Sequence, residues 1–427
     1  MRFATALLMV MTVSGCLGTT TELIDGGSVA FIDGGGPVRD AGRDLLDAGL
    51  GRDAGTGVAT DAGVTADFPV WRRAIAKWAW REIPGTSMTT VTVADPFSGE
   101  MVAPTARLDA WNGLAANRDT NRVYLANAGG HADWAGNEAY EIDLQQDLPR
   151  WRLLRGSTMA PDVLASNGSQ GVFNNYYADG RPSSTHLYYA LQFVRSRNRI
   201  FKMCSGSIWG TGNEGNNLVD AFSLDSNDWD PAGTWAATPN GSADTAIINR
   251  PFAQHPDSDD LYTFFTAAFR KWSAADGTWS KLADRPSYAN DDIVGASASA
   301  VDPVRQRVLY TVNQYRVAQH QGLLYAIDSK ALTDATFTGP AAADVSGAEN
   351  GLAYVPSDGA YLLKLSLAGR VIRIDPVTFM ATDLATTGSA PPNAVNGVHT
   401  KWLYLPRLKG FAYLPHGSAN FWFLAVE

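Results

Sequence analysis

Cysteine is almost absent from this chain, whose 427 residues include only Cys16 and Cys204. Cys16 belongs to a targeting signal described below, so Cys204 has no partner and no internal disulfide is expected. Export does not require one, because a folded region of this length buries a sufficient core without cross-links.

Positive charge and the common catalytic motifs are also scarce. Lysine and arginine number 34 against 43 acidic residues, a net charge of −9, whereas nucleic-acid binding needs a basic surface. The sequence contains no phosphate loop, no paired Cys-x-x-Cys, no His-Glu-x-x-His and no nucleophile elbow. These absences argue against a nucleic-acid partner and leave no motif for nucleotide, zinc-protease or α/β-hydrolase chemistry.

The N-terminus has the pattern of an export signal. Arg2 precedes an apolar stretch over residues 4–13, which is too short for a membrane-spanning helix of about 20 residues. The stretch ends in Val13-Ser14-Gly15-Cys16, which resembles a bacterial lipobox. The resemblance implies a signal peptide over residues 1–15, cleavage before Cys16 and diacylglycerol on its sulfur. The alternative is an ordinary signal peptide with an incidental cysteine.

Residues 16–66 are predicted to form a disordered tether behind the lipidated Cys16. Asp-Ala-Gly occurs four times, and Phe31 is the only aromatic residue. Such a segment buries too little surface to offset its chain entropy, and its fifty residues reach roughly 35–40 Å. Leu17, after the cysteine, is not the Asp that retains lipoproteins of this family at the inner membrane. We therefore favour an outer-membrane anchor.

Residues 67–427 repeat one phrase six times. The phrase is an apolar residue, one residue of any type, a proline, four further residues and then an apolar pair, so that the proline lies five residues ahead of the pair. Proline occupies this position in four copies, and arginine takes its place in two: Pro256, Pro303, Pro356 and Pro406, with Arg118 and Arg195. Short runs rich in Val, Tyr, Phe and Ile separated by Gly, Asp, Asn and Pro are typical of strands, and a period of this size predicts a β-propeller.

The second half of each repeat narrows the class. Blade one reads Val123-Tyr124-Leu125, then Gly129-Gly130, an aromatic third strand, and Trp151 in the fourth. A Gly-Gly pair, an aromatic and a tryptophan at these places resemble the kelch repeat, the repeat of galactose-oxidase-type central domains, although only blade one keeps the Gly-Gly pair. The fold class is thus all-β, with six four-stranded kelch-like blades. Seven blades remain an alternative if residues 173–181 and their neighbours hide a degenerate blade.

Ring closure follows from the two chain ends. The last blade has only three strands before the chain stops, and residues 77–84 have the Trp-x-x-apolar form of the fourth strands. An N-terminal strand that completes the last blade removes an open sheet edge. The sequence therefore predicts closure by that strand.

Propeller topology gathers the candidate site residues at one mouth of the central channel. The start of each inner strand and the end of each second strand lie on the same face. Positions the same number of residues ahead of the second strand in each blade should form a ring around this mouth. The ligand-binding candidates on this face are Asp109, Trp111, Asp133, Trp134, Asn137, Tyr189, Trp209, Glu349, Asn350 and His399, and the catalytic candidates are His131, His186, Tyr188 and Arg250. Each also has a structural interpretation, in which the aromatics pack in the core and the histidines are satisfied internally.

Two functions fit these residue types. Aromatic faces with polar groups between them suit sugars, so an envelope-anchored propeller that binds a carbohydrate, a cell-surface polymer or a protein partner is the first hypothesis. The alternative is a polysaccharide lyase. Arg250 or Asn350 would neutralise a uronic-acid carboxylate, His186 or His131 would take the adjacent proton, and Tyr188 would protonate the leaving oxygen. The segment ending in His186-Leu187-Tyr188 resembles His/Tyr segments of propeller-type polysaccharide lyases.

The remaining expectations concern cofactors and partners. A galactose-oxidase copper site is not expected, because no His or Tyr segment matches that family and Cys204 lies in a second strand. No cofactor is predicted, and a histidine-bound divalent metal stays open. The chain is expected to act as a monomer, attached to the membrane only through Cys16.

Overall fold

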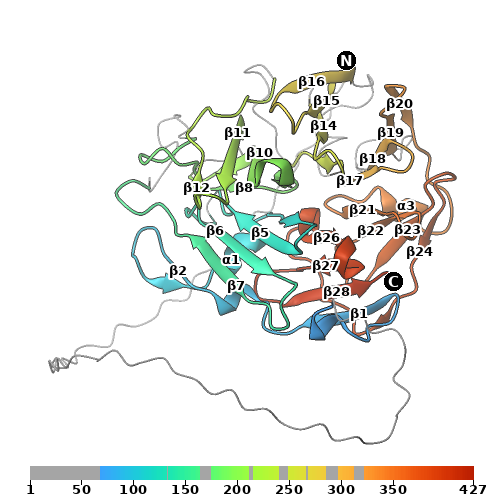
Figure 1. Ribbon diagram of the computed structural model, residues 1–427, viewed down its shortest axis with the longest axis horizontal. Helices are drawn as coiled ribbons and strands as arrows, with labels where there is room; N and C mark the ends of the chain where they lie inside the picture. Colours follow the sequence, from blue (N-terminus) through green and yellow to red (C-terminus); the bar gives the residue numbers. More distant parts are fainter. Residues whose placement is uncertain are drawn as a thin grey trace, which may run out of the picture. The chain divides into compact units, whose positions relative to one another are not determined.

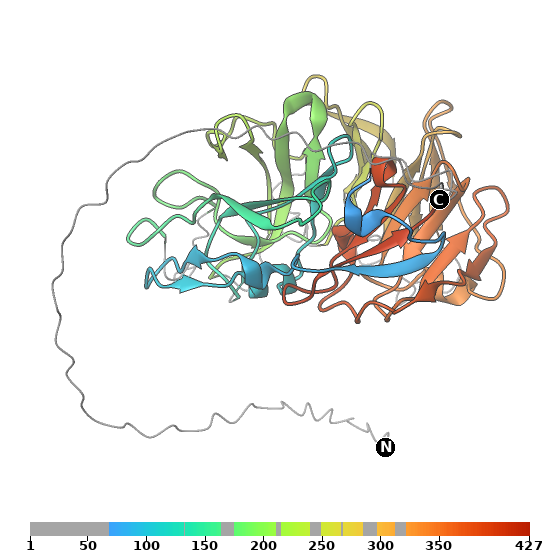
Figure 2. The same cartoon turned by 60° about the horizontal axis from the view of Figure 1, so that its bottom comes forward.

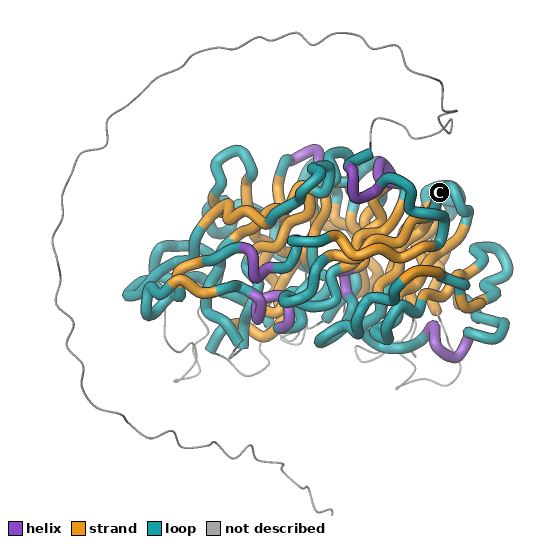
Figure 3. Tube along the Cα trace, turned by 90° about the horizontal axis from the view of Figure 1, so that it is seen from below, coloured by secondary structure: helices purple, strands orange, loops and turns teal. Residues whose placement is uncertain are grey.

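The computed structural model describes residues 68–427 except residues 132, 164–174, 211–214, 240–248, 266–267, 285–296 and 312–321. The segments predicted to be a signal peptide and a tether, together with Cys16, therefore lie outside the described residues. Within the described part, no helix is long and apolar enough to cross a membrane. The helices are short segments beside a molecule built of strands (Figure 3).

Six β-sheets form the blades of a ring, which confirms the predicted six-bladed propeller (Figure 1). Part of the segment on which the seven-blade alternative rested, residues 173 and 174, lies outside the described residues. Blades one to three contain, in order, β4 (Ala115–Asn117), β5 (Arg122–Ala126), β6 (Ala139–Asp143) and β7 (Trp151–Arg155); β8 (Thr185–His186), β9 (Leu191–Val194), β10 (Arg199–Ile208), β11 (Asn216–Ser223) and β12 (Asp228–Trp229); and β13 (Ala253–Gln254), β14 (Leu261–Phe265), β15 (Ala268–Trp272) and β16 (Trp279–Asp284).

Blades four to six repeat the same antiparallel meander. They contain β17 (Ser299–Asp302), β18 (Arg307–Thr311), β19 (Gly322–Ala326) and β20 (Ala331–Asp334); β21 (Gly351–Val355), β22 (Ala360–Lys364), β23 (Val371–Ile374) and β24 (Ala381–Asp383); and β26 (Trp402–Leu405), β27 (Gly410–Tyr413) and β28 (Phe421–Ala425). The inner strand of each blade, which is β9 in blade two, lines the channel, and inner strands of neighbouring blades pack together, as β17 does on β21.

The N-terminal strand closes the ring as predicted. β1 (Ala79–Ile83) pairs antiparallel with β28, with Trp80 opposite Leu424 and Ile83 opposite Phe421. Figure 2 shows the blue β1 lying along the red strands of the last blade. The short β25 (Thr387–Gly388) adds a parallel pairing outside β1. The first and last described strands therefore hold the ring together.

Nine short elements of the described chain lie outside the blade strands or between them. They are the hairpin of β2 (Val93–Ala94) and β3 (Met101–Val102), the helices α1 (Thr105–Asp109) and α3 (Ala342–Val345), and the single-turn 3-10 helices η1 (Val70–Arg72), η2 (Met88–Thr90), η3 (Arg195–Arg197), η4 (His399–Lys401) and η5 (Pro406–Leu408).

The repeated proline phrase forms the turn between the first two strands of each blade. In blade six, Pro406 begins η5 and Lys409 ends it in the left-handed conformation, at φ 56°. The residue just before or near the start of the second strand has positive φ in every blade: Asn121, Asn198, Asp259, Gln306, Gly359 and Lys409. Proline is favoured because its fixed φ suits the first residue of such a turn.

Aromatic side chains fill the space between blades. Tyr124 of blade one stacks on Phe193 of blade two, with ring centroids 5.2 Å apart. Trp402 stacks on Phe411 at 3.9 Å in blade six. Trp151, a fourth-strand tryptophan, is buried and donates its indole N–H to the carbonyl of Thr86. These contacts confirm the structural interpretation of such residues.

Candidate functional site

The central channel encloses a cavity of about 350 Å³. Inner strands of all six blades line its wall. Tyr189, His399 and Thr400 lie where the chain enters these strands, and Arg118 and Arg195 lie where it leaves them. We call the entry end the mouth and the other end the turn end.

A strained turn recurs at the mouth in every blade that the structure describes there. The residue twelve positions ahead of the second strand has positive φ in five blades: Trp111 (52°), Tyr188 (49°), Asn249 (64°), Glu349 (59°) and His399 (46°). Positive φ is unusual for such bulky side chains and clusters at functional sites. The sixth position, residue 296, lies outside the described residues.

Backbone hydrogen bonds between blades hold this conformation. The carbonyl of Trp111 accepts from the N–H of Tyr188 at 2.8 Å, and the carbonyl of Glu349 accepts from the N–H of Val398 at 2.7 Å. Gly113 lies so close to Thr400 and to the backbone of Tyr188 that a Cβ at this position would overlap Thr400 Oγ1 and the Tyr188 carbonyl. Hydrogen bonds between neighbouring blades thus fix these positive-φ residues in the channel wall.

Asp133, His186 and Tyr188 form a relay at the mouth. Asp133 Oδ2 lies 2.7 Å from His186 Nε2, and His186 Nδ1 lies 3.4 Å from the Tyr188 hydroxyl. The carboxylate is an acceptor, so it selects the tautomer with the proton on Nε2 and leaves the Nδ1 lone pair facing Tyr188.

Burial sets the protonation states of this relay. It lowers the pKa of His186, against the opposing effect of Asp133. It raises the pKa of Tyr188 to about 12, against a hydrogen bond from Ser207. At neutral pH the imidazole is therefore neutral and can accept a proton, and the phenol is protonated and can donate one.

Trp111 and His131 flank the relay. The ring of Trp111 lies 5.2 Å from that of His186 at an interplanar angle of 32°, and the ring of His131 lies 6.2 Å away. Trp111 and His131 are half-buried and Asp133 is exposed, whereas His186 is buried. The relay is therefore reached through a rim that carries an indole face, an imidazole and a carboxylate.

A second histidine lies across the mouth. His399 packs edge-on against Tyr188 at 5.4 Å and against Tyr189 at 4.9 Å. Its Nε2 is 4.0 Å from Glu349 Oε1, and neither ring nitrogen makes a hydrogen bond to a described residue. Burial and the neighbouring Lys401 hold its pKa well below the usual range.

Glu349 and Lys401 complete this half of the mouth. Burial raises the pKa of Glu349, and Lys401 opposes that rise. Lys401 is fully buried, which lowers its pKa to about 8, against Asp109 and Glu349. Sequence reasoning missed Lys401, whose position in η4 matches no repeated feature.

Four other predicted residues make structural contacts. Asp109 accepts from the N–H of Gly417 at 2.9 Å. Tyr189 is buried, and its hydroxyl donates to the carbonyl of Asn350, whose own side-chain amide donates to the Gly347 carbonyl. Arg250 is 3% exposed and lies near enough to Cys204 to oppose the rise that burial causes in its pKa. Because the side chains of Arg250 and Asn350 are buried, neither is exposed to neutralise a substrate carboxylate as the sequence predicted.

Trp134 and Trp209 lie beside the mouth. The Arg107 guanidinium sits 3.2 Å from the centroid of Trp134, whose indole N–H donates to Glu138. Trp209 is half-buried, with its ring 6.2 Å from that of Phe97. The carbonyl of His131 accepts from Gly210 at 2.6 Å, which joins the Trp209 segment to the mouth.

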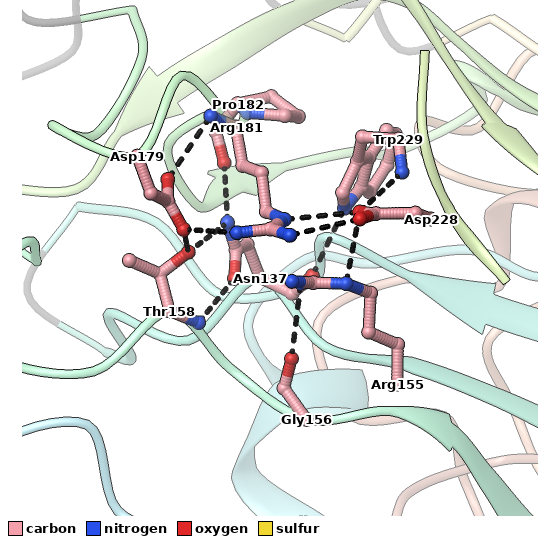
Figure 4. Close-up of polar contacts among 9 residues, drawn as sticks. All are labelled: Asn137, Arg155, Gly156, Thr158, Asp179, Arg181, Pro182, Asp228 and Trp229. Carbon is pink, nitrogen blue, oxygen red and sulfur yellow. Dashed lines mark hydrogen bonds and ion pairs between the residues drawn. The ribbon is translucent and has the colours of Figure 1, made fainter.

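Asn137 belongs to a polar clamp between blades one and two (Figure 4). Its side chain donates to Thr158 Oγ1 and to the Pro182 carbonyl, both at 3.0 Å, and accepts from the Thr158 N–H at 2.8 Å. Arg181 bridges Asp179 and Asp228 in the same network. All polar atoms of the Asn137 side chain are thus engaged within the protein.

These observations define the class: a six-bladed β-propeller with a ligand-sized central cavity and a titratable mouth. Among the described residues, no group of three or more His, Cys, Asp or Glu side chains is placed to hold a metal ion. No protein-family model matches the chain, and no curated protein matches it. Among solved structures, one titled "Structure of YjhT" is similar with a TM-score of 0.44 and 8% identity, over 73% of this chain and 92% of that one.

Proposed function

We propose that this protein is an envelope-anchored propeller whose mouth binds a carbohydrate. The observation that carries the proposal is the rim itself. The half-buried indole of Trp111 lies beside His186, and the exposed Asp133 and partly exposed Glu349 supply carboxylates around it. An apolar ring face with polar groups beside it matches a sugar, whose faces are apolar and whose edge carries hydroxyls.

The strained backbone supports a binding role. Five blades hold non-glycine residues at positive φ around one mouth, at a cost of the order of 1–3 kcal/mol each. Trp111, Tyr188 and Glu349 are of residue types that rarely adopt this conformation, which supports a role for their side chains in binding.

β-Elimination is the second candidate, and the relay favours it. Neutral His186 Nδ1 would take the proton from the carbon next to the uronate carboxylate. The electron pair would form the new C=C bond as the C–O bond to the leaving sugar breaks, and the Tyr188 hydroxyl would protonate that oxygen. The buried Arg250 and Asn350 leave the carboxylate without the expected partner, so binding is the better-supported function.

The proposal also includes a kelch-like subclass for the blades and a lipid anchor at Cys16. Lipidation of Cys16 would attach the mature chain to the membrane, and Leu17 favours the outer membrane. Labelled fatty acid should enter the wild-type chain and not Cys16→Ser. Retention of label in that variant would contradict the anchor.

The test of function uses the purified full-length protein with Cys16→Ser, probed with a panel of neutral and acidic polysaccharides. Binding and the ultraviolet absorbance of unsaturated uronic ends are measured together. Trp111→Ala should weaken binding about tenfold or more, whereas Trp279→Ala, at a half-buried tryptophan of β16, should not. Absence of binding across the panel, or equal loss in both variants, would refute the carbohydrate site.

The same assay separates catalysis from binding. A rise in absorbance that disappears in His186→Ala and Tyr188→Phe would establish β-elimination. Saturable binding with a flat absorbance trace would leave the binding function and remove the lyase.

A further inference from the structure

The turn end of the channel departs from the repeat at two neighbouring blades. Four blades place proline at the turn position, and blades one and two place Arg118 and Arg195 there. All four prolines and both arginines line the cavity. Proline suits this turn for backbone reasons, so its replacement by arginine in adjacent blades puts two guanidinium groups at one end of the channel.

The two arginines differ in their partners. Arg195 is paired: its Nε lies 2.9 Å from Asp259 Oδ1, and its Nη1 lies 3.4 Å from Asp119. Arg118 makes no hydrogen bond or ion pair with any described residue. Burial and repulsion by Arg195 lower the pKa of Arg118, and Asp259 and Asp119 oppose that effect from beyond ion-pair distance.

An unpaired guanidinium inside a channel wall is costly. Partly buried charges are normally paired, because desolvation is not otherwise repaid. Asp259 cannot serve both arginines fully, because its Oδ1 and Oδ2 already accept from Arg195 and from the Ser196 N–H. The exposed Asp257 also lines the cavity, but it makes no ion pair with Arg118. The Arg118 guanidinium, which has no ion-pair partner in the described part of the chain, is therefore suited to bind an anion.

Unpartnered polar groups continue along the same cavity. His399 is 1% exposed with both ring nitrogens free of hydrogen bonds, and Thr400 Oγ1 and Ser299 Oγ are buried without partners among the described residues. All three line the cavity. Its volume of about 350 Å³ lies at the lower end of small-molecule sites, which span roughly 300–1,000 Å³. Buried polar atoms are normally satisfied, so these groups around one cavity are suited to hydrogen-bond a polar ligand.

We propose that the central channel binds a small polyhydroxylated ligand that ends in an oxyanion, held by Arg118 at the turn end. The hydroxyls of the ligand face Ser299, Thr400 and His399 toward the mouth. The oxyanion is a carboxylate or a phosphate, both of which the guanidinium fork can bind bidentately. This site lies inside the channel and does not depend on carbohydrate binding at the rim.

The test compares matched ligands by isothermal titration calorimetry on the full-length protein. Lactobionate carries a carboxylate, lactose is its neutral counterpart, and inorganic phosphate represents the second source of an oxyanion. Lactobionate or phosphate should bind at least about tenfold more tightly than lactose. Arg118→Gln should abolish that preference, and Arg118→Lys should restore it only in part, because lysine lacks the fork.

Arg152→Gln is the matched control, since Arg152 lies on β7 with a side chain 65% exposed. It should leave oxyanion binding unchanged. Binding of lactobionate alone identifies a carboxylate ligand, and binding of phosphate alone identifies a phosphate ligand. Equal affinity for lactose, no binding of either anion up to millimolar concentration, or unchanged affinity in Arg118→Gln would each overturn the proposal.

Stability of the unliganded protein gives an independent check on folding. Arg118→Gln removes an unpaired, partly buried charge, so the melting temperature of the variant without ligand should equal or exceed that of wild type. Added oxyanion should raise the melting temperature of wild type and not of the variant. A variant that melts lower than wild type without ligand would show that Arg118 is structural and would overturn the assignment.

Discussion

Replacing Glu138 with glutamine tests how much one buried carboxylate contributes to the wall of blade one. Glu138 is 2% exposed and is the hub of four side chains. It accepts from Arg107 Nε at 2.9 Å, the Trp134 indole at 2.9 Å, the Tyr140 hydroxyl at 3.0 Å and Ser157 Oγ at 2.7 Å. Glutamine keeps the shape of this hub and removes its charge.

The expected cost follows from the burial of Arg107. Its side chain is 3% exposed, so the guanidinium would stay in the wall without a counter-charge. Breaking a buried ion pair in this way costs about 3–5 kcal/mol. For roughly 360 folded residues, unfolding entropy near 2.1 cal/mol/K per residue converts this into a fall of about 4–7 °C in Tm.

Glu141→Gln is the matched control, three residues further along the chain on β6. Glu141 is also buried, but its partners Arg152 and Arg122 are 65% and 44% exposed and can return to water. Its loss should cost about 1 kcal/mol or less. Thermal and urea unfolding of both variants give the comparison. Equal costs for Glu138→Gln and Glu141→Gln would refute the reasoning that burial of the partner sets the penalty.

Three further predictions concern the mouth and the core. Stability should fall as pH drops below about 6.5, by up to about 1.4 kcal/mol per pH unit for each histidine held neutral, because the folded pKa of His399 lies below its unfolded value; His399→Gln should flatten urea-unfolding free energies between pH 7 and 5. Gly113→Ala should cost about 1–3 kcal/mol by chemical denaturation, because its Cβ would overlap Thr400, whereas Gly156→Ala, with open space around it, should cost less than about 1 kcal/mol. Burial lowers the pKa of Lys364 to about 7, so between about pH 10.4 and pH 7 the unfolded chain binds a proton that the folded chain does not. The free energy of unfolding should therefore fall as the pH drops from about 10.4 toward 7. Lys364→Met should remove this pH dependence of stability, and an unchanged pH profile in the variant would contradict the prediction.

The blade pattern was accessible from sequence because it is local and repeated. Each predicted start of a second strand lies within one residue of the observed one, as at Val123 in β5 and Phe411 in β27. Proline or arginine five residues ahead marks the turn in all six blades. A shift of one residue would exchange the two faces of a strand, so this register also predicts which residues surround the mouth.

The register brought several of the candidate residues to one place and left their roles undetermined. Trp111, His186, Tyr188, Glu349 and His399 do meet at the mouth. Nothing in the repeat could show that five blades adopt positive φ there, because that conformation depends on hydrogen bonds between neighbouring blades.

Partner choice was likewise decided only in three dimensions. Asn137 occupies the same stretch of blade one as the candidates at the mouth, yet its polar atoms are used in the clamp with Thr158 and Pro182. Arg250 has the correct register and is buried. Burial and pairing depend on contacts from other blades, which no single repeat encodes.

From the sequence alone, the all-β class, a propeller of six or seven blades, the closing strand and several residues of the channel mouth could be predicted, because strand period and turn chemistry act over a few residues. The contacts of His186 with Asp133 and Tyr188, and the lack of a hydrogen-bond or ion-pair partner for Arg118 among the described residues, follow only from the tertiary structure. The physical reason is that pKa values and unpaired charges arise from desolvation, and desolvation depends on what segments distant in the chain place around a group.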